Sequence, residues 1–265
     1  MRAKNNPLVI IIPVAVAVIT HLLVFLGLYF SWFGITDGTG GNFCELSHEG
    51  LIKQPSNTLS NFGFMLAGLL AAYQIYKGKF DNNNNPLTTT LFYPIVLTSL
   101  MVLLSPGSMA MHGSETSVGG YFDMLSMYLI AGIIFSYAAM RLFKLSELTY
   151  ALVFIGTLVI CHIFHYSTWE PPLVGFAGSF IFGVFCILGV IFEIIHKIKD
   201  KPKSEIKWVI YASIVFSIAF AIWQIGWDEH PWCMPDAIVQ AHAIWHILDA
   251  VAIYCFFRLY VSEDN

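Results

Sequence analysis

Long apolar runs are the feature of this sequence that most restricts its fold. Runs of about 20 mostly apolar residues, the length that crosses a bilayer as a helix, recur about eight times. The predicted spans lie near residues 7–32, 57–76, 91–111, 121–142, 148–166, 173–195, 207–227 and 238–261. Charged residues make up only 11% of the chain, whereas soluble domains average about 25%. The sequence therefore predicts an all-α, polytopic membrane helical bundle, with the first run retained as an anchor.

Basic residues are distributed unevenly between the connections of this bundle. Of the 13 lysines and arginines, all except Lys53 fall on one side of an eight-span arrangement. They are Arg2, Lys4, Lys77, Lys79, Arg141, Lys144, Lys197, Lys199, Lys201, Lys203, Lys207 and Arg258. Since lysine and arginine mark the cytoplasmic side of membrane proteins, both termini are predicted to be cytoplasmic. The net charge of −4 gives no indication of nucleic-acid binding, and nothing indicates an obligate protein partner.

Two cysteines fall in outer segments under this orientation. Cys44 follows the first span and Cys233 precedes the last, so both face an oxidising compartment if the outside is periplasmic or lumenal. A disulfide that ties the first span to the last is one interpretation, and two unpaired thiols are the other.

Five polar side chains interrupt the apolar spans at similar depth, just below the outer surface. Ser108 and His112 occupy one face of the last outer turn of the third span, because they are four residues apart. Asp123 lies in the first turns of the fourth span, and His242 and His246, again four apart, in those of the eighth. Because the orientation was derived from lysines and arginines alone, this convergence is independent of it.

The five side chains are typical of a catalytic metal site. Ionisable groups within a bilayer are costly and usually face the bundle interior or a cavity. Two histidines at i and i+4 with a third from another helix form a three-histidine site that suits zinc and leaves one position open. Zinc lowers the pKa of its bound water to about 7, so that Asp123 is a candidate proton acceptor and Ser108 a candidate donor to an oxyanion. A single histidine at a helix end is more often an interfacial residue than a metal ligand. The similar depth of the three histidines and Asp123 is what favours metal binding here.

The pattern S-x3-H-x10-D followed late by H-x3-H resembles that of the alkaline ceramidases, within a wider superfamily of membrane hydrolases and receptors. The segments "FCELSHEGLIKQPSNTLSNFGF" (43–64) and "WDEHPWC" (227–233) are also similar to ceramidase segments. The resemblance covers residues 42–261. It implies a seven-helix ceramidase-like domain over 42–265 plus an extra N-terminal transmembrane helix and outer loop over 1–41. The extra helix suggests a bacterial-type member in an inner membrane.

Residue by residue, the resemblance implies a set of roles. It makes His112, His242 and His246 zinc ligands, Asp123 the residue that activates the attacking water, and Ser108 the one that supports the oxyanion. It also matches Cys44 and Cys233 with a family disulfide. Asp249 shares the face of the last two histidines, so it either hydrogen-bonds a ligand histidine or makes a polar contact deeper in the bundle.

The resemblance also bears on calcium. Animal ceramidases have a calcium site whose matching positions here are Asn42, Phe43, Glu45, Ser47 and Gln54. Calcium prefers several charged oxygens and this set holds one carboxylate, so we do not expect tight calcium binding. Asn57, Thr58, Ser60 and Asn61 are expected to cap and pack the second span.

These observations predict a zinc-dependent amidohydrolase that cleaves the N-acyl amide of ceramide or a related sphingolipid into fatty acid and sphingoid base. The active site is expected near the outer face, where a membrane lipid reaches it. Two alternatives stay open: a lipid esterase or phospholipase-type hydrolase with the same site, and a non-catalytic, receptor-like protein in which zinc is structural.

Overall fold

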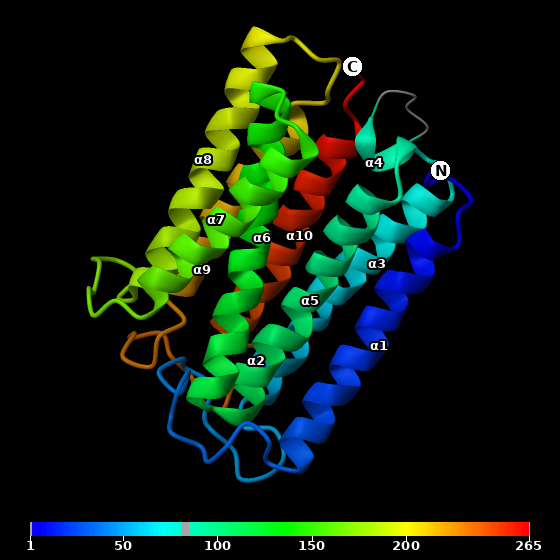
Figure 1. Ribbon diagram of the computed structural model, residues 1–265. Helices are drawn as coiled ribbons and strands as arrows, with labels where there is room; N and C mark the ends of the chain where they lie inside the picture. The colour runs from blue at the N-terminus through cyan, green and yellow to red at the C-terminus, as the bar shows by residue number, and fades with distance from the viewer. Residues whose placement is uncertain (1, 81–84, 265) are drawn as a thin grey trace.

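A computed structural model describes residues 2–80 and 85–264. Within these residues the chain forms ten helices, and the long ones run alongside one another in a single bundle (Figure 1). They are α1 (Leu8–Tyr29), α2 (Pro55–Ser60), α3 (Phe62–Tyr76), α4 (Pro86–Thr89), α5 (Phe92–Ser114), α6 (Ser117–Phe143), α7 (Glu147–His165), α8 (Ala177–Lys199), α9 (Lys207–Gln224) and α10 (Ala241–Val261).

Eight segments of the described chain are long and apolar enough to cross a membrane, with α2 and α3 together forming one of them, Pro55–Tyr76. The predicted all-α membrane bundle and its number of spans are therefore confirmed. The observed ends of the spans differ from the predicted ones by a few residues: the fourth begins at Ser117 rather than near 121.

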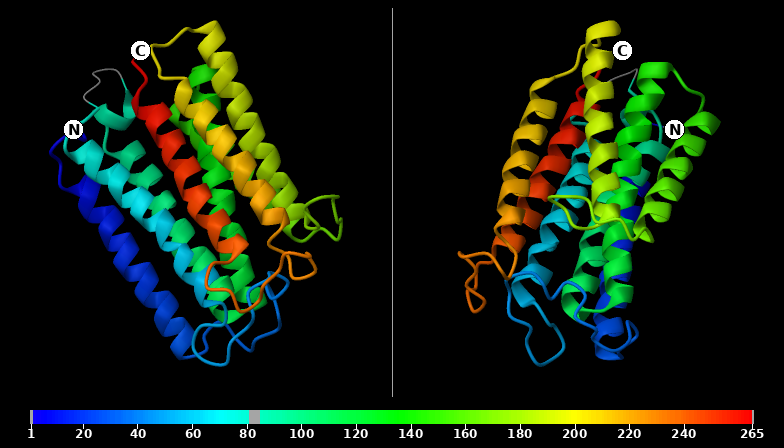
Figure 2. Two further views of the ribbon diagram at one scale, coloured as in Figure 1. Left: turned by 180° about the vertical axis from the view of Figure 1, so that it is seen from behind. Right: turned by 90° about the vertical axis from the view of Figure 1, so that its left-hand side faces the viewer.

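The most buried helices are α5, α6 and α10, which therefore form the centre of the bundle. The helix α10 lies between α3 and α9 (Figure 2), and α6 packs against α5 on one side and α8 on the other. Only 17% of the residues in the spans of the outer helices α7 and α9 are buried, as expected for helices that face lipid. The polar residues Ser108, His112, Asp123, His242 and His246 on these three helices are buried.

A very short connection between α5 and α6 sets the depth of the polar residues on both helices. Helix α5 ends at Ser114 because Glu115 adopts a left-handed backbone conformation (φ 50°), and its N–H bonds the carbonyl of Met111. The side chain of Thr116 then accepts from the N–H of Gly119 and starts α6. Ser108 lies six residues before the end of α5, and Asp123 six residues after the start of α6. At 1.5 Å per residue, both lie about 9 Å from the turn.

Glycines bring α5 and α6 close together at this level. A Cβ atom at Gly107 would lie 2.6 Å from the side chain of Ser126 and 2.9 Å from the carbonyl oxygen of Phe122. A Cβ atom at Gly119 would lie 2.5 Å from the carbonyl oxygen of Ala110. Only glycine permits these contacts, so the close approach places the residues around Ser108 directly against those around Asp123.

The extra N-terminal helix α1 packs on α5 and α3. Inside it, His21 contacts the carbonyl oxygen of Ala17 through Nδ1 (2.7 Å) and the hydroxyl of Ser105 through Nε2 (2.8 Å). Its ring also stacks on Phe62, with ring centroids 5.4 Å apart. His21 is thus a hydrogen-bonded packing residue that fastens α1 to the bundle.

Both termini lie at the same end of the bundle, opposite α2 and the long connections that join α1 to α2 and α9 to α10 (Figure 1). The backbone of Ala3 bonds Thr88 before α5, and that of Lys203 bonds Asp264 near the C-terminus. At this end Arg141 of α6 forms ion pairs with Glu193 of α8 and Glu263. The predicted placement of both termini on one side of the membrane agrees with this arrangement.

Candidate metal centre

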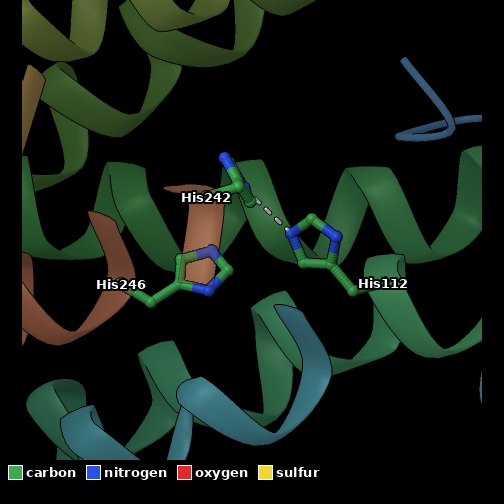
Figure 3. Close-up of side chains that lie close together, drawn as sticks. All are labelled: His112, His242 and His246. Carbon is green, nitrogen blue, oxygen red and sulfur yellow. Dashed lines mark hydrogen bonds between the residues drawn. The ribbon is translucent and has the colours of Figure 1, made fainter. Parts of the chain in front are cut away.

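The three histidines predicted to share a site converge in the bundle. His112 comes from the last turn of α5, and His242 and His246 come from the first two turns of α10 (Figure 3). Each offers a ring nitrogen within 4.8 Å of those of the other two, and all three residues are buried. The Nε2 atoms of His112 and His242 are 3.2 Å apart. The predicted grouping of the histidines is confirmed, and the cluster can hold a metal ion.

The orientation of the His112 ring is set by Gln54, the residue before α2. The amide nitrogen of Gln54 donates to the carbonyl oxygen of Gly40 (2.9 Å) and to the Glu115 carboxylate (3.0 Å). Its amide oxygen therefore faces Nδ1 of His112, at 2.6 Å. Because an amide oxygen only accepts hydrogen bonds, the proton of neutral His112 is on Nδ1, and Nε2 carries a lone pair.

The ring of His246 is held in the same way by Ser60 of α2. The Ser60 hydroxyl donates to the carbonyl oxygen of Asn57, 2.9 Å away. Its oxygen lies 2.8 Å from Nδ1 of His246 and accepts that proton. This arrangement also directs the lone pair of Nε2 to the centre of the cluster.

These tautomers make the cluster suited to a cation. With His112 protonated on Nδ1, its Nε2 lone pair faces Nε2 of His242 at 3.2 Å, and it accepts either a proton carried by His242 or a cation bound between the two nitrogens. Two nitrogens bound to a tetrahedral zinc ion at 2.0–2.1 Å lie about 3.3 Å apart. A donor set of three neutral imidazoles suits zinc, and the spacing of the His112–His242 pair is close to this value.

The two predicted catalytic residues lie together on neighbouring helices. The hydroxyl of Ser108 on α5 faces the Asp123 carboxylate on α6, and both residues are buried. Ser126 donates to the backbone carbonyl of Asp123 (2.7 Å), which leaves the carboxylate to Ser108. Ser108 is one helical turn from His112, so the pair lies next to the histidine cluster. The roles of Ser108 and Asp123 stay predictions.

Asp249 is placed one turn deeper than His246 on α10. The hydrogen bonds of the His112 and His246 rings go to Gln54 and Ser60 instead. The Oδ1 atom of Asp249 is buried and has no hydrogen-bond partner among the described residues. Both roles considered for Asp249 therefore stay predictions.

The outer segments are joined by the predicted disulfide, Cys44–Cys233. The backbone N–H of Cys44 also bonds the carbonyl oxygen of Gly226, and that of Leu46 bonds Pro235. The segment after α1 is thereby attached to the connection between α9 and α10, which leads directly into the first turn of α10 with His242.

Sequence patterns did not identify the residues that hold the histidine rings. Ser60 was expected only to cap and pack the second span, and Gln54 was considered only for calcium. Gln54 precedes α2 and Ser60 is its last residue. The only sequence feature that could have pointed to them is the run of polar residues at the start of an apolar span. Glu115, which accepts from Gln54 and from Ser47 (2.7 Å), gave no signal at all.

Replacing Gln54 with leucine is expected to weaken metal binding about 10- to 100-fold, the usual effect of removing the hydrogen-bond partner of a metal-bound histidine. The matched control is Gln74→Leu, which removes another buried amide, bonded to Tyr254 at the opposite end of α3. Competition with a chromophoric chelator measures both dissociation constants. Equal affinities in the two variants would contradict the role assigned to Gln54.

The part of the chain that contains the histidine cluster and the disulfide matches a known protein family. The ceramidase family model matches residues 39–262, most of the chain, including all three histidines and both disulfide cysteines. None of the curated proteins matched the sequence. The match agrees with the resemblance seen in the sequence motifs and with the buried histidine cluster. The chain belongs to the ceramidase family.

Proposed function

We propose that this protein is an integral-membrane, zinc-dependent amidohydrolase that cleaves the N-acyl amide of ceramide or a related sphingolipid. Membership of the ceramidase family implies a hydrolase that acts on an amide. The observation that carries the proposal is the buried cluster of His112, His242 and His246, whose donor atoms face one another. The alternatives, an ester hydrolase and a receptor-like protein, lack an observation in their favour.

Different residues of the site have different roles in the proposed reaction. His112, His242 and His246 would hold a zinc ion. Bound there, zinc would supply a Lewis acid for the amide carbonyl and would lower the pKa of a water molecule to about 7. Asp123 accepts a proton from the attacking water at a carboxylate oxygen and returns a proton to the amine nitrogen as the C–N bond breaks.

Ser108 has a different task, because its hydroxyl can donate to the negative charge that develops on the carbonyl oxygen. The same hydroxyl faces Asp123 before substrate binds. Addition of water to the amide then yields one fatty acid and one sphingoid amine.

A lipid substrate is supported by the surroundings of the cluster. The histidines lie near one end of a membrane bundle, and the connection from α9 to α10 exposes apolar side chains beside them. Trp232 is 72% exposed, Ile238 91% and Val239 70%. Side chains of this kind are stable in the bilayer interface, where the headgroup and amide of a sphingolipid lie.

We place both termini in the cytoplasm and the histidine cluster near the outer face. The support is the asymmetry of the basic residues, because all lysines and arginines except Lys53 belong to the end that carries the termini. We further propose that this is a bacterial inner-membrane protein, in which residues 1–41 precede a ceramidase-like domain over 42–265. The additional helix α1 is the support for this division.

The function is tested by incubating purified, zinc-loaded protein in lipid vesicles with N-acyl sphingosine and with phospholipids, followed by mass spectrometry of the products. Fatty acid and sphingoid base are expected from the amide substrate alone, with activity lost on chelation and restored by zinc. Fatty acid released only from phospholipids would replace the proposal with an ester hydrolase. Stoichiometric zinc without turnover of either substrate would favour the receptor-like alternative.

Calcium is expected to have no effect on stability or turnover. Both carboxylate oxygens of Glu45 accept backbone N–H groups at the start of α2, from Ser56 (2.6 Å) and Asn57 (2.7 Å), and burial raises the pKa of Glu45. Ser47 and Gln54 are bonded to Glu115. Thermal unfolding of the zinc-loaded protein with calcium up to about 1 mM, the range of weak extracellular sites, measures this. A saturable rise in Tm would show that calcium is a cofactor after all.

A further inference from the structure

His242 differs from the other two histidines in how its ring is held. The Nδ1 atoms of His112 and His246 have hydrogen-bond partners, Gln54 and Ser60. The Nδ1 atom of His242 is buried and has no hydrogen-bond partner among residues 2–80 and 85–264. A metal-bound histidine is normally oriented by a hydrogen bond from its second nitrogen, so another contact must orient this one.

That contact is the ring of Phe43, which stacks on the His242 ring. The ring centroids are 3.6 Å apart and the ring planes are inclined by 24°. The same phenyl ring lies 5.6 Å from His112 and 5.3 Å from Trp227, measured between centroids. Phe43 is buried, and so it covers the histidine cluster on the side of the outer segments.

The backbone around Phe43 is fixed at several points to the connection that leads into α10. The adjacent Cys44 forms the disulfide with Cys233. The N–H of Cys44 bonds Gly226, and the N–H of Asp228 bonds the carbonyl oxygen of Asn42. Phe43 also forms an isolated antiparallel bridge with Trp227. The phenyl ring and the helix that carries His242 are therefore parts of one cross-linked unit.

We propose that Phe43 is the positioning residue of His242, and that the Cys44–Cys233 disulfide acts on the metal centre by holding the Phe43 ring against the imidazole. This inference rests on the proposed function only in taking the three histidines as metal ligands. The oxidation state of an outer-face disulfide would then control how tightly the protein holds its metal.

The first test compares the zinc dissociation constants of single variants, measured by chelator competition. Phe43→Leu is expected to bind zinc about tenfold more weakly, the upper end of what one aromatic pair contributes. Phe43→Tyr keeps the ring and is expected to bind as the unsubstituted protein does. The matched control is Phe64→Leu, because Phe64 is a buried ring 6.3 Å from His246, whose orientation depends on Ser60 instead.

The second test asks whether the disulfide acts through the ring. Cys44→Ala/Cys233→Ala is expected to weaken zinc binding in the otherwise unsubstituted protein but to add nothing in the Phe43→Leu background, because coupled residues are non-additive. If this double variant does not fold, reduction and alkylation of the folded protein replaces it. An equal loss in both backgrounds would overturn the proposed route.

Cobalt gives a readout that simple loss of stability does not change. The visible spectrum of the Co²⁺-substituted protein reports the coordination of the ion, and it is expected to change in Phe43→Leu and to be restored in Phe43→Tyr. Failure of the unsubstituted protein to bind zinc or cobalt would refute the metal site itself. Normal metal binding with an unchanged affinity and spectrum in Phe43→Leu would refute only the role of Phe43.

Discussion

Replacing His242 with alanine is expected to remove most of the bound zinc and to lower amide hydrolysis at least about 10³-fold, since a metal ion supplies several kcal/mol of transition-state stabilisation. His242 is one of three donors that lie within 4.8 Å of one another, and its Nε2 is 3.2 Å from that of His112. Two remaining imidazoles cannot hold zinc in a catalytic geometry. Zinc per protein, measured by inductively coupled plasma mass spectrometry, and the rate of fatty-acid release are the two measurements.

His162→Ala is the matched control for this variant. His162 also lies near the outer end of a span, in α7, but it is exposed to the surroundings of the bundle. This control is expected to keep its zinc and its activity. A His242→Ala protein that folds, lacks zinc and still hydrolyses ceramide would contradict the metal-dependent mechanism.

Replacing Asp123 with asparagine is expected to lower kcat about 10²- to 10⁴-fold, the usual effect of removing a general acid–base group, while zinc content stays unchanged. The amide is nearly the same size as the carboxylate and keeps a polar group opposite Ser108, so the close packing of α5 and α6 is preserved. It has no carboxylate oxygen to take up a proton. Steady-state kinetics together with metal analysis separates this loss from a loss of zinc.

Asp236→Asn provides the comparison for Asp123→Asn, because Asp236 is an exposed carboxylate in the connection before α10. Its activity is expected to equal that of the unsubstituted protein. If Asp123→Asn retained full turnover, another group would have to transfer the protons, and Asp249 has a buried oxygen without a hydrogen-bond partner among the described residues.

Local sequence patterns were sufficient for the framework of the bundle. The length of each apolar run determines whether it can cross a membrane, and the number of spans was confirmed among the described residues. Spacing of four residues within one helix likewise predicts that His242 and His246 share a face. Both arguments use neighbours in the chain, so they need no knowledge of the packing.

Local sequence patterns predicted the ends of the spans and the α5–α6 turn less well. The fourth span begins at Ser117 because Thr116 caps it and Glu115 adopts the left-handed conformation, and hydropathy does not detect either event. This turn nonetheless decides that Ser108 and Asp123 lie at one level. The close approach of the two helices also depends on Gly107 meeting Ser126, a contact between different helices.

The amino-acid sequence by itself thus determined the eight spans, the gathering of the basic residues at one end and the shared helix face of His242 and His246. Only the tertiary structure decided which nitrogen of each ring faces the cluster. Rotation of an imidazole is a local freedom that a distant partner removes: Gln54 for His112, Ser60 for His246 and the Phe43 ring for His242. These partners are separated from their histidines by 58, 186 and, for Phe43, 199 positions in the chain (242 − 43), and no periodicity extends over such distances.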